Sequence, residues 1–307
     1  MSPEIAWGQG ERTFSAMTPV GPAESSWGAA FDLTAIDWNG DGLRDVHICN
    51  DGPNGEPDRV LCASDDGFYD CDTQGANVAL FCMGTAIGDI NRDGLLDLYL
   101  SASEGHALLL NSEQGFYDAT AAMFSLEFDS DQMGWGAAIV DLNNDGLPDL
   151  LSANGDFSMR DGQWPLWAFL QSDDGQFTES GEQLGFPQLT GGRGVIVQDL
   201  NGDGVVDVLM GDMARPPWLL LSDGCTDASW ITLAAPPQSI VTVEADGEKY
   251  TALITDDPGY GASAPATLHI GLGTKKSIDR IELQIPGYGP VHLEGPITPR
   301  RQLTWTP

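Results

Sequence analysis

The most chemically distinctive feature of this chain is a nine-residue acidic pattern, D-x-N-x-D-G-x-x-D, that occurs four times. The copies are DWNGDGLRD at 37–45, DINRDGLLD at 89–97, DLNNDGLPD at 141–149 and DLNGDGVVD at 199–207. Each copy places carboxylates at positions 1, 5 and 9 and an amide at position 3. The glycine at position 6 permits a sharp turn. Oxygen donors at this spacing can surround a hard cation, and four copies indicate four such sites.

The donor set predicts about four calcium ions. Positions 1, 3, 5 and 7 follow the order of ligands in the first part of an EF-hand loop, with a backbone carbonyl at position 7. A flexible cage made only of oxygens suits Ca²⁺ better than Mg²⁺ or a soft transition metal. A single copy would leave open that these are only Asx-rich turns, but four copies favour calcium. The predicted ligands are Asp37, Asn39, Asp41, Leu43, Asp45, Asp89, Asn91, Asp93, Leu95, Asp97, Asp141, Asn143, Asp145, Leu147, Asp149, Asp199, Asn201, Asp203, Val205 and Asp207.

Charge supports a structural role for these ions. The 307 residues carry a formal net charge of −33, and four Ca²⁺ would change it to −25. Without metal, three carboxylates in one turn repel each other, so calcium should stabilise the fold by mass action. We expect each ion to hold the turn between the first two strands of its unit. The acidic surface excludes nucleic acid as a partner, because phosphates would be repelled.

The loops belong to a longer repeat, since they begin 52, 52 and 58 residues apart. Short β-rich runs separated by Gly, Asp and Asn turns flank each loop, with four strands in most units. This period predicts an all-β fold, a small β-propeller of four calcium-loop blades. The last unit lacks a regular fourth strand near Cys225. We expect RTFSAMTPVG, residues 12–21, to join that unit and close the ring.

Five cysteines indicate disulfide bonds. A two-residue turn at Asp66-Gly67 would place Cys62 directly opposite Cys71, where a disulfide is possible. Cys49 and Cys82 flank this hairpin and could form a second bond, which leaves Cys225 over. The alternative is five buried thiols. Disulfides would indicate an oxidising compartment.

The sequence contains no run long enough to span a bilayer and opens with no secretory signal peptide. Met1 is either a start added to a mature protein or the start of a protein that stays inside the cell. We expect a secreted or periplasmic location, with the cytoplasm as the alternative.

The repeats and their flanking strands resemble the FG-GAP/VCBS class of calcium-binding propeller repeats over about residues 12–223. LHIGLG (268–273) and IDRIEL (278–283) are similar to the ASPIC/UnbV domain of cartilage-acidic-protein-like proteins. The resemblance implies a propeller at 12–229, followed by an ASPIC/UnbV-like β segment at 230–307. That segment is either a fifth blade or a docked β-domain. The resemblance also implies extracellular interaction or adhesion.

One candidate ligand site lies at the start of the innermost strands, on the face opposite the loops. Trp27, Met83, Trp135 and Arg193 each precede the repeated glycine and should converge at one mouth. Two indoles, a thioether and a guanidinium would form an apolar pocket with a cation. The alternative is that they fill the channel as core.

Two functions remain open at this point. The first is a non-catalytic binding module for a protein or a glycan. The second is a calcium-dependent propeller enzyme (a hydrolase, lyase or cyclase) that acts on a small molecule at the mouth. Catalytic residues cannot be assigned, because P-loop, HExxH, nucleophile-elbow and dinucleotide patterns are absent from the sequence. His47 and His269 are expected to be packed rather than catalytic.

Overall fold

The computed structural model describes residues 4–5, 18–19, 28–39, 41–52, 56–71, 75–103, 105–126, 128, 133–156, 164–224, 227–256 and 260–306. Within these ranges the protein is all-β, as the sequence predicts. Its one helix there is a single turn, α1 (Thr120–Met123). No helix among the described residues is long and apolar enough to cross a membrane.

Each acidic loop joins the first two strands of an antiparallel sheet. The first three sheets have four strands and the last has three. Their strands are β3 (Ala30–Ile36), β4 (Asp45–Asn50), β5 (Arg59–Ser64) and β6 (Gly67–Asp70); β7 (Cys82–Gly88), β8 (Asp97–Ala102), β9 (Gly105–Leu110) and β10 (Tyr117–Asp118); β11 (Gly134–Val140), β12 (Asp149–Asn154), β13 (Trp167–Gln171) and β14 (Phe177–Glu179); and β15 (Gly192–Gln198), β16 (Asp207–Asp212) and β17 (Trp218–Leu220).

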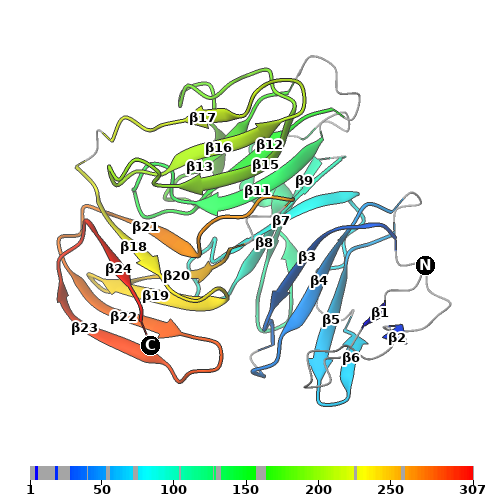
Figure 1. Cartoon of the computed structure of the whole chain (residues 1–307), viewed down its shortest axis with the longest axis horizontal. Coiled ribbons are helices and arrows are strands. Elements are labelled where there is room, and N and C mark those ends of the chain that lie inside the picture. The colour runs from blue at the N-terminus through cyan, green and yellow to red at the C-terminus, as the bar shows by residue number, and fades with distance from the viewer. Residues whose placement is uncertain are drawn as a thin grey trace.

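The four sheets pack through their first strands, in the order β3, β7, β11 and β15 (Figure 1). The repeated glycine explains this close approach. A Cβ on Gly84 would lie 2.2 Å from the Trp135 carbonyl oxygen, and one on Gly136 would lie 2.6 Å from that of Arg193. The second strands β8 and β12 are buried at every residue, which explains why neither shows the polar–apolar alternation of a strand with one exposed face.

The C-terminal segment forms two sheets around one apolar core. Burial alternates along β18 and β19, as expected for strands with one face in a core. A single propeller blade would be one sheet, so this topology favours the docked β-domain over the fifth blade. Its strands are β18 (Ser229–Ala234), β19 (Ser239–Ala245), β20 (Glu248–Ile254), β21 (Thr267–Gly273), β22 (Ile278–Gln284), β23 (Val291–Ile297) and β24 (Arg301–Thr304).

The N-terminal segment differs from expectation where the structure describes it. β2 (Thr18–Pro19) pairs with β1 (Glu4–Ile5) instead of with β17. Among the described residues, the sheet of β15, β16 and β17 contains no N-terminal strand. The rest of 12–21 lies outside the described residues.

Both predicted disulfides are present, Cys49–Cys82 and Cys62–Cys71. The expected hairpin register, however, is wrong. Ser64 pairs with Gly67 and Cys62 with Tyr69, so the turn is Asp65-Asp66 rather than Asp66-Gly67. Gly67 takes the positive φ of 122° that follows this turn. Cys71 is therefore offset by two residues from the position opposite Cys62, and the bond runs diagonally between β5 and the residue that follows β6. Cys225 lies outside the described residues.

Candidate functional site

The four acidic loops share one pattern of hydrogen bonds. In the second loop, Asp89 accepts the backbone N–H of Asp93 on Oδ1 at 3.0 Å and that of Gly94 on Oδ2 at 2.9 Å. Asn91 also accepts the Asp93 N–H, and Asp93 accepts the Leu95 N–H. The same four bonds recur in the first, third and fourth loops. The side chains at positions 1, 3 and 5 are therefore held on the inside of one tight turn.

The carboxylate at position 9 has a bracing role that the sequence did not reveal. One oxygen of Asp149 accepts the Leu142 N–H at 2.9 Å, and the other accepts the Gln171 N–H at 2.9 Å. The first bond reaches position 2 of the loop, and the second reaches the end of the third strand. Equivalent pairs are made by Asp45, Asp97 and Asp207, and all four side chains are buried. This residue thus ties each loop to its own sheet.

Electrostatics in the middle loops favour a bound cation. Burial, with a smaller contribution from neighbouring loop carboxylates, raises the pKa of Asp89 to about 6 and that of Asp97 to about 7. Burial likewise raises the pKa of Asp141 to about 7 and that of Asp149 to about 8. In the described part of the chain, no ion pair neutralises these four carboxylates. A divalent cation would supply the missing positive charge.

The donor set therefore fits calcium, but the carboxylates of each loop must still come together around one point. Among the residues that the structure describes, no three His, Cys, Asp or Glu side chains are already gathered as a metal site. In each loop the carboxylates accept backbone N–H groups instead. Calcium would bind by drawing the oxygens at positions 1, 3 and 5 together, and the sharp turn already places these residues side by side.

The structure brings two of the four predicted mouth residues into contact. The Arg193 guanidinium lies 4.0 Å from the centre of the Trp135 ring, as expected for residues that converge. The Trp135 indole is buried and donates to the Gly155 carbonyl at 2.7 Å, so it is part of the core. Met83 is also fully buried. Trp27 lies outside the described residues.

Two aromatic residues that the sequence did not single out complete the mouth. Phe31 stacks on Tyr260 with ring centres 6.4 Å apart, and Tyr260 contacts Trp135 edge-on at 4.8 Å. Phe31 keeps 38% of its surface exposed. Tyr260 comes from the C-terminal segment, so the repeat pattern could not place it here. We call Phe31, Trp135, Arg193 and Tyr260 the aromatic mouth.

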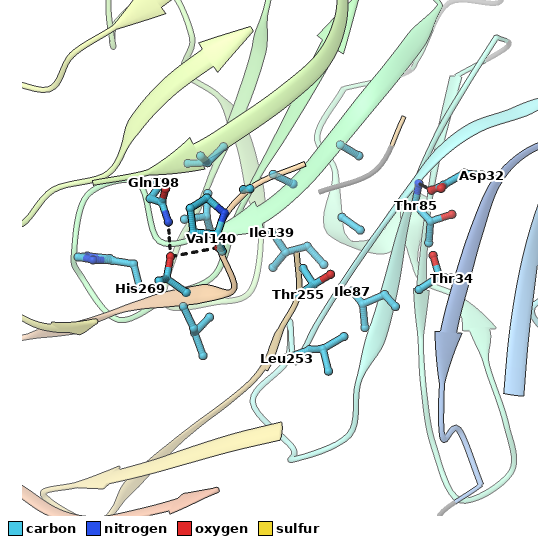
Figure 2. A pocket seen from close by; sticks show the side chains of 18 residues that line it. Asp32, Thr34, Thr85, Ile87, Ile139, Val140, Gln198, Leu253, Thr255 and His269 are labelled. Atoms are coloured by element: carbon cyan, nitrogen blue, oxygen red, sulfur yellow. Dashed lines mark hydrogen bonds between the residues drawn. The ribbon is translucent and has the colours of Figure 1, made fainter. Parts of the chain in front are cut away.

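A cavity of about 130 Å³ lies where the first strands of the four sheets meet β20 and β21. In Figure 2, Asp32 and Thr85 lie at one end and Gln198 and His269 at the other. The Gln198 amide donates to the Thr267 hydroxyl, and the Thr85 N–H donates to Asp32. Apolar side chains line the cavity between these two ends, among them Ile87, Ile139, Val140 and Leu253. The C-terminal domain therefore completes the wall around this central space.

His47 and Asp212 both contact other residues in ways that favour a structural role over a catalytic one. His47 is fully buried with Nε2 3.4 Å from Asp58 Oδ2, so it is packed as expected. For Asp212, near the mouth, burial alone would raise the pKa. Hydrogen bonds from the Trp218 indole and three backbone N–H groups outweigh this and lower it. An acid held ionised by four donors is poorly suited to proton transfer at neutral pH.

Comparison with known proteins identifies the repeats. A family model described as an FG-GAP-like repeat matches residues 37–100, 89–152 and 141–210, which together cover more than half of the chain. A search of curated proteins finds no significant match.

Similar solved structures include the exotype rhamnogalacturonan lyase YesX, at 15% identity and a TM-score of 0.35. That similarity covers 88% of this chain and 55% of the lyase. A Tc holotoxin pore from Photorhabdus luminescens matches at 15% identity and a TM-score of 0.26, over 91% of this chain and 13% of the toxin chain. The chain thus spans about half the length of the lyase and a small part of the toxin.

Proposed function

This chain belongs to the FG-GAP-like repeat family, and we propose that it is a calcium-binding β-propeller that acts as an extracellular binding module for a protein or a glycan. The observation that carries the proposal is the single hydrogen-bond pattern shared by all four acidic loops. Four loops of one geometry imply four ions of one kind, held by the oxygens at positions 1, 3, 5, 7 and 9.

Two further observations support an extracellular binding role. The two disulfides are typical of proteins from an oxidising compartment. The aromatic mouth, where the structure describes it, exposes the Phe31 ring, and its four defining residues include no carboxylate for acid–base chemistry. Binding is therefore favoured over catalysis at this site.

The partner should be neutral or basic. A net charge of −33, or −25 with four calcium ions bound, repels polyanions. Aromatic faces such as that of Phe31 suit the apolar face of a neutral sugar ring or an aliphatic side chain. Among glycans, we propose neutral rather than uronic-acid-rich or sulfated ones.

Replacing the exposed aromatic side chain at the mouth should weaken ligand binding. We expect the wild-type protein to bind neutral glycans on a mixed glycan array in calcium-containing buffer. Phe31→Ala should lower the affinity for the best array hit about fivefold, since a stacked ring contributes about 1 kcal/mol.

Tyr69→Ala is the matched control, because Tyr69 is 52% exposed on β6, in the outermost strand of the same sheet. Its affinity should equal that of the wild type. Equal binding by Phe31→Ala and the wild type would contradict a ligand site at the aromatic mouth. A preference for acidic glycans would contradict the charge argument.

A further inference from the structure

Of the four acidic loops, the third makes the most direct hydrogen bonds to the C-terminal domain. Asn144, at position 4 of this loop, is fully buried and has a positive φ of 61°. Its side-chain amide donates to the Gly204 carbonyl of the fourth loop at 2.8 Å. Its side-chain oxygen lies 2.7 Å from Nε2 of His269 on β21, and its backbone carbonyl accepts the Gly273 N–H at 2.9 Å. One residue thus joins two loops and the C-terminal domain.

The hydrogen bonds fix the tautomer of His269. Because the Asn144 amide nitrogen donates to Gly204, the Asn144 oxygen must be the acceptor for His269. Nε2 of His269 therefore carries the proton, and its Nδ1 accepts from the Thr232 hydroxyl at 3.2 Å. Burial lowers the pKa of His269 to about 4, so the imidazole is neutral, and it connects β18, β21 and the loop.

The backbone of β21 lies directly on the predicted calcium ligands. A Cβ on Gly271 would lie 1.9 Å from Oδ2 of Asp141, and one on Gly273 would lie 2.8 Å from the Asp145 carbonyl oxygen. On the other side of the loop, Gly146 is covered by the Tyr250 ring. Any movement of Asp141 or Asp145 is therefore transmitted to β21.

The other loops have weaker or different contacts. Arg92, at position 4 of the second loop, reaches Glu248 at 3.4 Å, and both side chains are part-exposed. In the fourth loop, Gly204 packs against the Trp230 indole. In the first loop, Asp41 and Gly42 are exposed, and a Cβ on Gly42 would meet nothing within 4 Å. The four sites are thus unequal although their sequences are alike.

We propose that the third loop is a calcium-dependent latch that holds the C-terminal domain on the repeat region. An ion on Asp141 and Asp145 fixes the loop, and the fixed loop presents Asn144 to His269 and Gly273. Loss of that ion lets the loop relax and loosens β21, whereas loss of the first-loop ion does not. The latch rests on the proposed calcium binding and assigns a regulatory role to one of the four ions.

Hydrogen–deuterium exchange with mass spectrometry on the full chain tests the latch, with bound calcium counted by atomic emission on the same samples. Amides of β21 should be protected in calcium and exchange at least tenfold faster after EGTA treatment. Asp145→Ala should lose one ion and show the same fast exchange in calcium. Asp41→Ala, the equivalent change in the first loop, should lose one ion and leave β21 protected. Amides of β8 and β9, in a sheet whose loop neither substitution changes, report whether each variant is folded.

Asn144→Gly separates the latch from metal binding. The first and fourth loops carry Gly40 and Gly202 at this position, so the variant should keep all of its calcium. Its β21 amides should nevertheless exchange at least tenfold faster. Bound calcium with β21 exchange unaffected by EGTA or by Asn144→Gly would overturn the latch and leave the proposed function standing. A wild-type protein with no bound calcium would overturn both.

Discussion

Removing calcium with EDTA is expected to lower the melting temperature by more than about 10 °C, and added Ca²⁺ should restore it. Free ligand at about 100 times its dissociation constant stabilises a folded protein by about 2.7 kcal/mol per site. Four independent sites would then add about 11 kcal/mol to the free energy of unfolding. For a domain of this size, that gain raises the melting temperature by on the order of ten degrees or more. Metal-free carboxylates on Asp89, Asp97, Asp141 and Asp149 add to the effect, because burial already disfavours their charged form.

Differential scanning fluorimetry at several calcium concentrations measures this shift. Magnesium is the control, since the flexible all-oxygen loop should favour the larger ion, and millimolar Mg²⁺ should restore little of the loss. A melting temperature that does not respond to EDTA would contradict a structural role for calcium.

Asp149→Ala should destabilise the protein by about 2–6 kcal/mol even in the absence of calcium. The substitution leaves the Leu142 and Gln171 N–H groups without their acceptor, and each buried unsatisfied donor costs about 1–3 kcal/mol. The loss should appear in urea unfolding curves recorded in EDTA, where ligation of calcium plays no part.

Asp173→Ala removes the same side chain from an exposed position nearby and should change stability by less than about 0.5 kcal/mol. If Asp149→Ala in EDTA is as stable as this control, position 9 serves only as a ligand and the bracing role is wrong.

The sequence predicted the features that depend on local repetition. Four nonapeptides of one pattern, each followed by a β-rich run, are sufficient to place the loops, the sheets and the missing fourth strand of the last unit. The β-rich runs of 230–307 likewise predicted strands. Their partition into two sheets depends on pairings such as β18 with β24, which lie far apart in the chain.

The errors have identifiable physical causes. Gly67 follows the Asp65-Asp66 turn instead of lying within it, so the hairpin register shifted although the disulfide formed. The bracing bonds of Asp149 link a loop to a strand more than twenty residues later, and no local pattern reveals such a contact. Tyr260 joins Phe31 and Trp135 only because the C-terminal segment crosses the mouth. Each case is a tertiary contact that a repeat alignment cannot contain.

The sequence also did not show that the four loops make different contacts with the C-terminal domain. Asn144 occupies a position where the other loops have Gly40, Arg92 and Gly202, and nothing in the pattern marks it as special. Its importance comes from Gly271 and Gly273, which let β21 approach the third loop closely.

The most direct test of the central claim is a count of bound metal. Protein purified in calcium and desalted should contain about four Ca²⁺ per chain by atomic emission, and Asp145→Ala, prepared in the same way, should contain about three. Four ions in both proteins, or none in the wild type, would contradict the assignment of the acidic loops as calcium sites.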